Sequence, residues 1–158
     1  MKGIIATLIL ISLVFLIPTC VNSQSLENDP VSWKYNIKKT GNRTYEVIIS
    51  AIIQNGWHIY AQQQPTEGIA LPTTIKFSNN PLVQISGKPK EVGKLEKKID
   101  PILDVEQFQY SNNVAFVQKI QVKGNIKTKI KGSVSFMACT DEKCLPEKEI
   151  PFTIYLQN

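Results

Sequence analysis

The sequence predicts an all-β fold, an immunoglobulin-like antiparallel β-sandwich. Apolar and polar residues alternate with a period of two over eight or nine short segments, the pattern of half-buried strands. Turn signals containing Gly, Pro or Asn recur every 8–12 residues. No stretch keeps a helical period over more than two turns, whereas a parallel α/β fold would need helices between its strands. Short strands at this spacing favour a sandwich.

The expected strands follow from this alternation. In the first part of the chain we expect strands at residues 31–38, 45–53, 56–61, 74–77 and 82–85. Residues 87–101 are rich in Lys, Gly and Pro, so we expect an exposed loop there. Later strands are expected from residue 108, over 114–122, over 133–139 and over 150–156. The last two are joined through a segment that contains two cysteines.

Residues 1–23 have the features of a cleaved signal peptide. Lys2 supplies the positive start, and residues 4–17 form an apolar run without a charge. Val21 and Ser23 are small enough for a signal-peptidase site, so we expect cleavage after Ser23. The protein is therefore predicted to be exported to the periplasm or elsewhere in a bacterial envelope, with residues 24–158 as its single domain.

Cys20 offers an alternative start, a lipid-anchored cysteine. The preceding residue, Thr19, is larger than the usual Gly, Ala or Ser, and Ile17 replaces the usual leucine. The cleaved signal therefore fits the sequence better. Removal of the signal peptide takes Cys20 with it and leaves two cysteines, an even number in a compartment where disulfides persist.

The net charge of +5 does not indicate a nucleic-acid partner. The lysines are scattered and accompanied by acids. The densest cluster, residues 88–98, also contains Glu91 and Glu96. This pattern favours a solvated surface.

Cys139 and Cys144 are the candidate functional pair. Four polar residues separate them, and they lie at the two sides of the loop that joins the last two expected strands. If they face each other across an antiparallel pair, their Cα atoms should lie roughly 4.5–5.5 Å apart. A disulfide can close at that distance.

The residues alone do not decide whether this disulfide is structural or redox-active. In the chain-entropy model, a closed loop of about six residues stabilises the fold by only ~2 kcal/mol. The local charges are balanced as well. Lys143 would favour a thiolate at Cys144, and the nearby acids Asp141, Glu142 and Glu147 would oppose it.

A metal site is not expected. Two thiols and the single histidine, His58, are too few and too loosely spaced for zinc or copper. His58 is expected to be a partly buried strand residue. One histidine also leaves no readable Ser-His-Asp arrangement.

Three segments resemble a known family. They are AsnGlyTrpHisIleTyrAlaGln at 55–62, ProThrGluGlyIleAlaLeuProThrThrIleLysPhe at 65–77, and CysThrAspGluLysCysLeuProGlu at 139–147. In this order they resemble the N-terminal periplasmic domain of DsbD, the membrane thiol-disulfide reductase of bacteria. The likeness covers most of residues 31–156.

The resemblance implies an immunoglobulin-like fold and a dithiol/disulfide relay without a small cofactor. A DsbD-type membrane domain would donate electrons to this domain, which would reduce exported thiol-disulfide oxidoreductases. Cys144 would attack the partner disulfide, and Cys139 would resolve the mixed disulfide. The alternative is a non-catalytic sandwich that binds another envelope protein and keeps the disulfide for rigidity.

The resemblance also implies the surroundings of the pair. Tyr60 matches an aromatic residue beside the cysteines, and His58 stands where the family often has another aromatic residue. A cap loop would fall at residues 100–104, where Asp100 fits and where Ile102 and Leu103 replace aromatic residues. An apolar lid is expected, because thiol exchange needs controlled access. Either separate proteins carry the membrane and thioredoxin-like parts of the family, or this is a stand-alone domain with an altered role.

Overall fold

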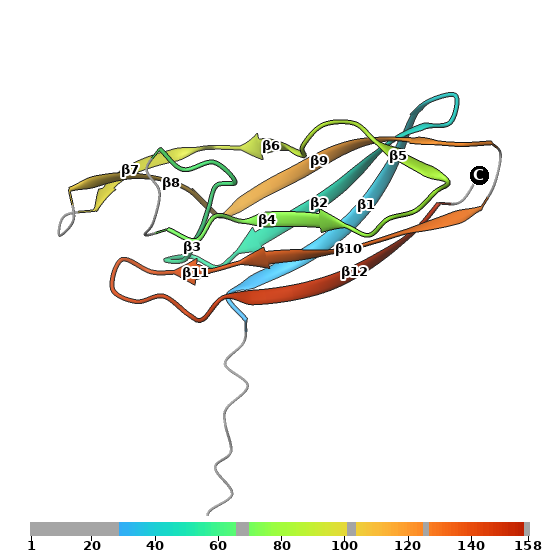
Figure 1. The fold of residues 1–158 in the computed structure, drawn as a ribbon. Helices are drawn as coiled ribbons and strands as arrows, with labels where there is room; N and C mark the ends of the chain where they lie inside the picture. Colours follow the sequence, from blue (N-terminus) through green and yellow to red (C-terminus); the bar gives the residue numbers. More distant parts are fainter. Residues whose placement is uncertain (1–28, 66–69, 101–103, 125–126, 157–158) are drawn as a thin grey trace, which may run out of the picture.

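The computed structural model describes residues 29–65, 70–100, 104–124 and 127–156, which form twelve strands (Figure 1). The strands are β1 (Val31–Gly41), β2 (Thr44–Ile53), β3 (His58–Tyr60), β4 (Thr74–Phe77), β5 (Val83–Ile85), β6 (Lys90–Gly93), β7 (Glu96–Asp100), β8 (Val105–Ser111), β9 (Asn113–Val122), β10 (Thr128–Phe136), β11 (Ala138–Cys139) and β12 (Lys148–Leu156). Within the described ranges no helix is long and apolar enough to cross a membrane. The predicted signal peptide lies outside them.

The strands form three antiparallel sheets. One has the order β1-β2-β9-β5, with β6 also pairing with β9, and the second has the order β12-β10-β4. The third has the order β11-β3-β8-β7. In Figure 1 the first two run alongside each other, and the third lies at one end of the molecule. This arrangement confirms the prediction of an all-β antiparallel fold.

Aromatic side chains of β1 join the two long sheets. The Trp33 ring lies 6.1 Å from the Phe116 ring of β9 and 5.1 Å from the Phe136 ring of β10. The Tyr35 ring stacks 5.3 Å from the Phe152 ring of β12. Alternate residues of β2 and β9 are buried beneath them, as the period of two requires. The hydrophobic core therefore lies between the two sheets.

The prediction of an exposed loop over residues 87–101 is wrong for most of that segment. Residues 90–93 form β6 on β9, and residues 96–100 form β7 on β8. Both strands keep apolar side chains in solvent: Val92 is 53% exposed and Ile99 is 68% exposed. Because neither strand buries a regular apolar face, the alternation that predicts a strand is missing from the sequence.

The hairpin of β10 and β12 carries the cysteine segment. Its register runs from Thr128 opposite Leu156 to Phe136 opposite Lys148. Strand β10 also pairs with β4, so it is the central strand of its sheet. At Gly132 a Cβ atom would lie 2.3 Å from the Lys76 carbonyl oxygen. The central strand thus packs so closely that only glycine fits at this position.

Candidate functional site

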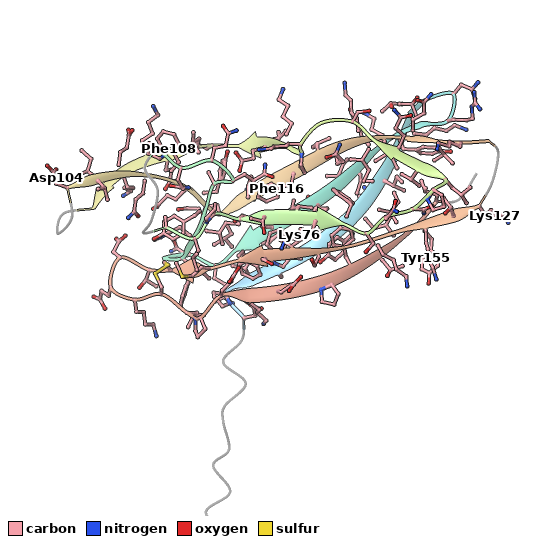
Figure 2. The ribbon with its side chains drawn as sticks, viewed as in Figure 1. Lys76, Asp104, Phe108, Phe116, Lys127 and Tyr155 are labelled. Atoms are coloured by element: carbon pink, nitrogen blue, oxygen red, sulfur yellow. A yellow bond between two sulfur atoms is a disulfide. The ribbon has the colours of Figure 1, made fainter. Side chains whose placement is uncertain are left out.

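A disulfide joins Cys139 and Cys144 beyond the end of the β10–β12 hairpin (Figure 2, yellow). Their S–S distance is 2.03 Å and their Cα atoms are 4.0 Å apart. The two residues form an isolated antiparallel bridge, as expected, although the Cα separation is shorter than predicted. The thiols do not lie on the long strands themselves. Cys139 belongs to the short β11, and Cys144 follows a tight turn.

Hydrogen bonds hold the turn between the cysteines. The Thr140 N–H donates to the Lys143 carbonyl at 2.7 Å, and the Leu145 N–H donates to the Ala138 carbonyl at 2.9 Å. The Thr140 hydroxyl oxygen also accepts bonds from the N–H groups of Glu142 (3.2 Å) and Lys143 (3.1 Å). These bonds involve no sulfur atom. The turn therefore has interactions of its own that keep the two cysteines opposite each other.

The two cysteines differ in their access to solvent. Cys139 has an exposed fraction of 0%, whereas Cys144 is exposed. Cys139 is covered because β11 pairs with β3, and Cys144 has no strand on its outer side among those described. An approaching protein therefore meets Cys144 first, and Cys139 can react only from inside the domain.

Two residues of β3, His58 and Tyr60, lie on the same face of the sheet as Cys139. His58 pairs directly with Cys139, and Tyr60 follows two residues later on the same face. Both side chains are buried, with exposed fractions of 7% and 6%, and their rings meet edge-on at 5.5 Å. The structure thus brings together four residues that the sequence singled out: Cys139, Cys144, His58 and Tyr60.

A polar cluster formed by Glu96, Gln109 and Ser111 continues this face across β8 and β7. His58 pairs with Ser111, and Tyr60 pairs with Gln109, which in turn pairs with Glu96. The Glu96 Oε2 atom accepts hydrogen bonds from the Ser111 hydroxyl at 3.0 Å and from the Gln109 amide at 3.3 Å. One carboxylate is therefore fixed on the side of His58 away from the disulfide.

Burial lowers the pKa of His58 below its ordinary value of 6.5. The negative charges of Asp141, on the cysteine turn, and Glu96 act in the opposite direction. Lys98 adds to the lowering. The imidazole is consequently neutral at pH 7, with a carboxylate on each side.

Sequence reasoning missed the polar cluster because its members come together only through long-range strand pairing. Trp57 was missed as well, although it lies in one of the family-like segments. The Lys143 Nζ atom lies 5.8 Å from the centre of the Trp57 ring, which places this indole beside the cysteine turn. Across the residues with described positions, no three His, Cys, Asp or Glu side chains are arranged to hold a metal ion.

The predicted cap falls at the tip of the β7–β8 hairpin. Asp100 is the last residue of β7, and its backbone pairs with Val105. Ile102 and Leu103 lie outside the described residues. The hairpin and the cysteine turn lie at the same end of the molecule (Figure 1). The lid at residues 100–104 stays a prediction.

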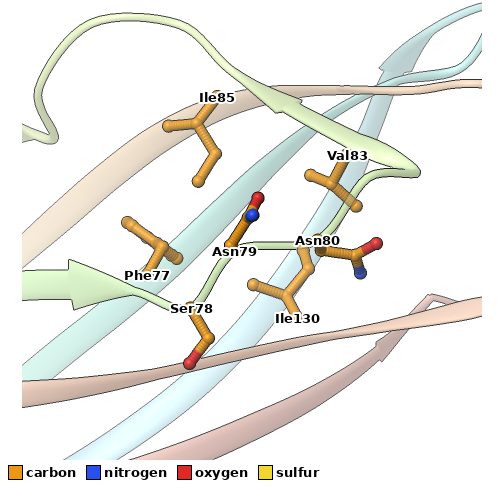
Figure 3. Close-up of a pocket in the computed structure, with 7 residues that line it drawn as sticks. All are labelled: Phe77, Ser78, Asn79, Asn80, Val83, Ile85 and Ile130. Carbon is orange, nitrogen blue, oxygen red and sulfur yellow. The ribbon is translucent and has the colours of Figure 1, made fainter.

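One surface pocket of the sandwich does not belong to this site. It has a volume of about 360 Å³ and is lined by residues from β4, β5, β10 and the β4–β5 connection (Figure 3). In Figure 1, β5 lies at the end of the molecule opposite β11. The pocket lining consists of Phe77, Ser78, Asn79, Asn80, Val83, Ile85 and Ile130. None of these side chains titrates, so the pocket supplies no acid, base or redox group.

Three solved structures share the fold. The reduced N-terminal domain of DsbD from Neisseria meningitidis has a TM-score of 0.54 and 16% identity, over 80% of this chain and 86% of that chain. The N-terminal periplasmic domain of ScsB from Proteus mirabilis has a TM-score of 0.55 and 14% identity, over 82% of this chain and 47% of that chain. The complex of the DsbD and PilB N-terminal domains from Neisseria meningitidis has a TM-score of 0.53 and 15% identity, over 78% and 80%. No curated protein matches the sequence.

The DsbD neighbours have an immunoglobulin-like fold, which confirms the fold type predicted from the strand pattern. At identities of 14–16% these structures establish the fold alone. The family itself follows from a sequence model described as thiol:disulfide interchange protein DsbD, N-terminal, which matches residues 23–154. That match includes both cysteines and every described strand except the end of β12. The chain belongs to the family of the DsbD N-terminal domain.

Proposed function

We propose that this protein is an exported thiol-disulfide interchange domain that passes reducing equivalents through Cys139 and Cys144. The observation that carries the proposal is the unequal exposure of the pair in a member of this family. An exposed Cys144 suits attack on another protein, and a buried Cys139 suits the step that must remain internal. A purely structural disulfide needs no such difference.

The exchange has two steps. The Cys144 thiolate attacks one sulfur of a partner disulfide, which forms a mixed disulfide and releases the second partner sulfur as a thiolate. Cys139 then attacks the Cys144 sulfur, closes the intramolecular disulfide and releases the first partner sulfur. Two electrons pass to the partner. A DsbD-type membrane donor would return the domain to its dithiol form by the reverse sequence.

The partners are proposed to be periplasmic thiol-disulfide oxidoreductases. A DsbD N-terminal domain with this fold has been captured in complex with the PilB N-terminal domain, and the ScsB neighbour is a periplasmic domain. The apolar start of the chain, followed by Val21 and Ser23, supports export with cleavage after residue 23. Lipid attachment at Cys20 is the less favoured route to the same compartment.

Titration of the purified protein with reduced and oxidised glutathione tests the proposal. We expect a reduction potential within the range of working disulfides, roughly −270 to −180 mV. A potential below about −300 mV would indicate a structural disulfide, and the non-catalytic binding module would then be the better description.

A further inference from the structure

The internal step of the exchange requires the Cys139 thiol to lose a proton. Only a thiolate attacks a disulfide, and burial disfavours that charged form. Cys139 is fully buried, so bulk water does not reach its sulfur to take the proton. A proton acceptor is therefore needed inside the domain, next to this residue.

His58 occupies the required position. It is the only histidine of the sequence and lies directly opposite Cys139 in the β3–β11 pair. Side chains of directly opposite residues point to the same face, with Cβ atoms roughly 4.5–5.5 Å apart. The His58 ring is itself buried and rests edge-on against Tyr60 at 5.5 Å. Its other neighbour across the sheet, Ser111, carries no charge.

The charges around His58 suit a group that gains and then loses a proton. Asp141 faces it from the cysteine turn, and Glu96 and Lys98 face it from β7. Because burial lowers its pKa, the ring is neutral at pH 7 and free to accept a proton. The two carboxylates then stabilise the imidazolium. Hydrogen bonds from Ser111 and Gln109 hold Glu96 in place for this role.

We propose that His58 is the general base for Cys139, an inference that rests on the interchange function proposed above. The neutral imidazole takes the Cys139 proton, and the thiolate electron pair forms the new bond to the Cys144 sulfur. The bond between Cys144 and the partner breaks, and the partner sulfur leaves with the electron pair. The imidazolium or water returns the proton to that leaving thiolate.

The two thiols can be observed separately with 5,5′-dithiobis(2-nitrobenzoate). The reduced protein should release one thionitrobenzoate when Cys144 attacks the reagent. It should release a second when the Cys139 sulfur bonds to the Cys144 sulfur and displaces the thionitrobenzoate left there. We expect His58→Gln to slow the second release by about 100-fold, the lower end of the range for general-base catalysis, with little change in the first.

The pH dependence of the second release distinguishes a base from a structural residue. In the unmodified protein this rate should level off above the pKa of His58 and stay nearly flat between pH 7 and 8. Without the base, the rate should follow the thiolate fraction of Cys139. It should then rise about tenfold per pH unit below the pKa of that thiol.

His58→Phe provides a second variant, because a phenyl ring keeps the aromatic packing against Tyr60. It should show the same slow, pH-dependent second release as His58→Gln. Ile59→Val is the matched control, since it changes the next residue of β3, whose side chain lies on the opposite face of the strand, and removes no base. The control should keep the flat profile. In a Cys139→Ala background, His58→Gln should leave the first release unchanged.

A second release that keeps its rate and flat profile in both His58 variants would overturn the inference and leave the interchange function standing. A reduced protein that releases neither equivalent would overturn both proposals together.

Discussion

Cys139 and Cys144 share one covalent bond but stand in different environments. The buried Cys139 belongs to β11 and pairs with β3. The exposed Cys144 follows a turn that has hydrogen bonds of its own. This difference supports the proposed order of events in the exchange, which the spacing of the two cysteines alone does not.

Removing each sulfur in turn should give different products. Cys139→Ala should accumulate a mixed disulfide at Cys144 when incubated with glutathione disulfide, because no internal thiol remains to resolve it. Cys144→Ala should form little adduct, since its remaining thiol is buried. Mass spectrometry of the intact, non-reduced proteins measures both products. Trapping that succeeds only in Cys144→Ala would reverse the assignment of nucleophile and resolver.

At the scale of single residues, the sequence identified site residues of rare types, and it did not identify site residues of common types. Two cysteines and one histidine stand out in any chain of this length, and the family resemblance added Tyr60. Glu96 and Ser111 do not stand out among the many acids and serines. Their importance arises from the register of β3, β8 and β7, which no local pattern encodes.

At the level of elements, strands that bury one face were predictable and strands that do not were missed. In β2 and β9 the apolar residues alternate and pack into the core, so the period of two is visible in the sequence. Strands β6 and β7 instead have lysines and largely exposed side chains. These two strands form because their backbones pair with β9 and β8. The residues that determine this pairing are spread over distant segments, so no local pattern predicts it.

Strand β10 supplies a test of how tightly the sheet beneath the cysteine turn is packed. At Gly132 an added Cβ would meet the Lys76 carbonyl oxygen at 2.3 Å and the Phe152 Cζ atom at 2.5 Å. The carbonyl belongs to the backbone of the paired strand β4 and cannot rotate away. We expect Gly132→Ala to lower the free energy of unfolding by about 1–3 kcal/mol, measured by urea denaturation.

Gly41→Ala is the matched control for this substitution. Its added Cβ would lie 3.7 Å from the Thr44 Cβ, an ordinary contact. Since alanine also restricts the unfolded chain, this variant should be neutral or slightly more stable. Equal losses in the two variants would contradict the close packing at Gly132.

For the whole molecule, the sandwich core and the cysteine pair are separate sources of stability. The core lies between the two long sheets, and the disulfide closes a short turn at one end. The proposed interchange function requires a domain that remains folded in both redox states. Its architecture meets this requirement, because the core contacts do not pass through the disulfide.

Reduction of the disulfide should therefore weaken the domain only slightly. Closing a loop of about six residues contributes ~2 kcal/mol, against the 5–15 kcal/mol that is usual for a folded domain. We expect urea unfolding of the oxidised and reduced proteins to differ by about that amount, with both cooperatively folded in water. Loss of cooperative unfolding on reduction would show that the disulfide is essential to the fold.

The positions of the two tryptophans have an optical consequence. Trp33 is half-buried and packs on the core against Phe116 and Phe136, far along the chain from the cysteine segment. Trp57 lies beside the cysteine turn, in contact with Lys143. A disulfide quenches the fluorescence of a nearby excited indole, and a dithiol does so less. We therefore expect the Trp57 fluorescence to respond to reduction of the disulfide, with the half-buried Trp33 as an internal reference.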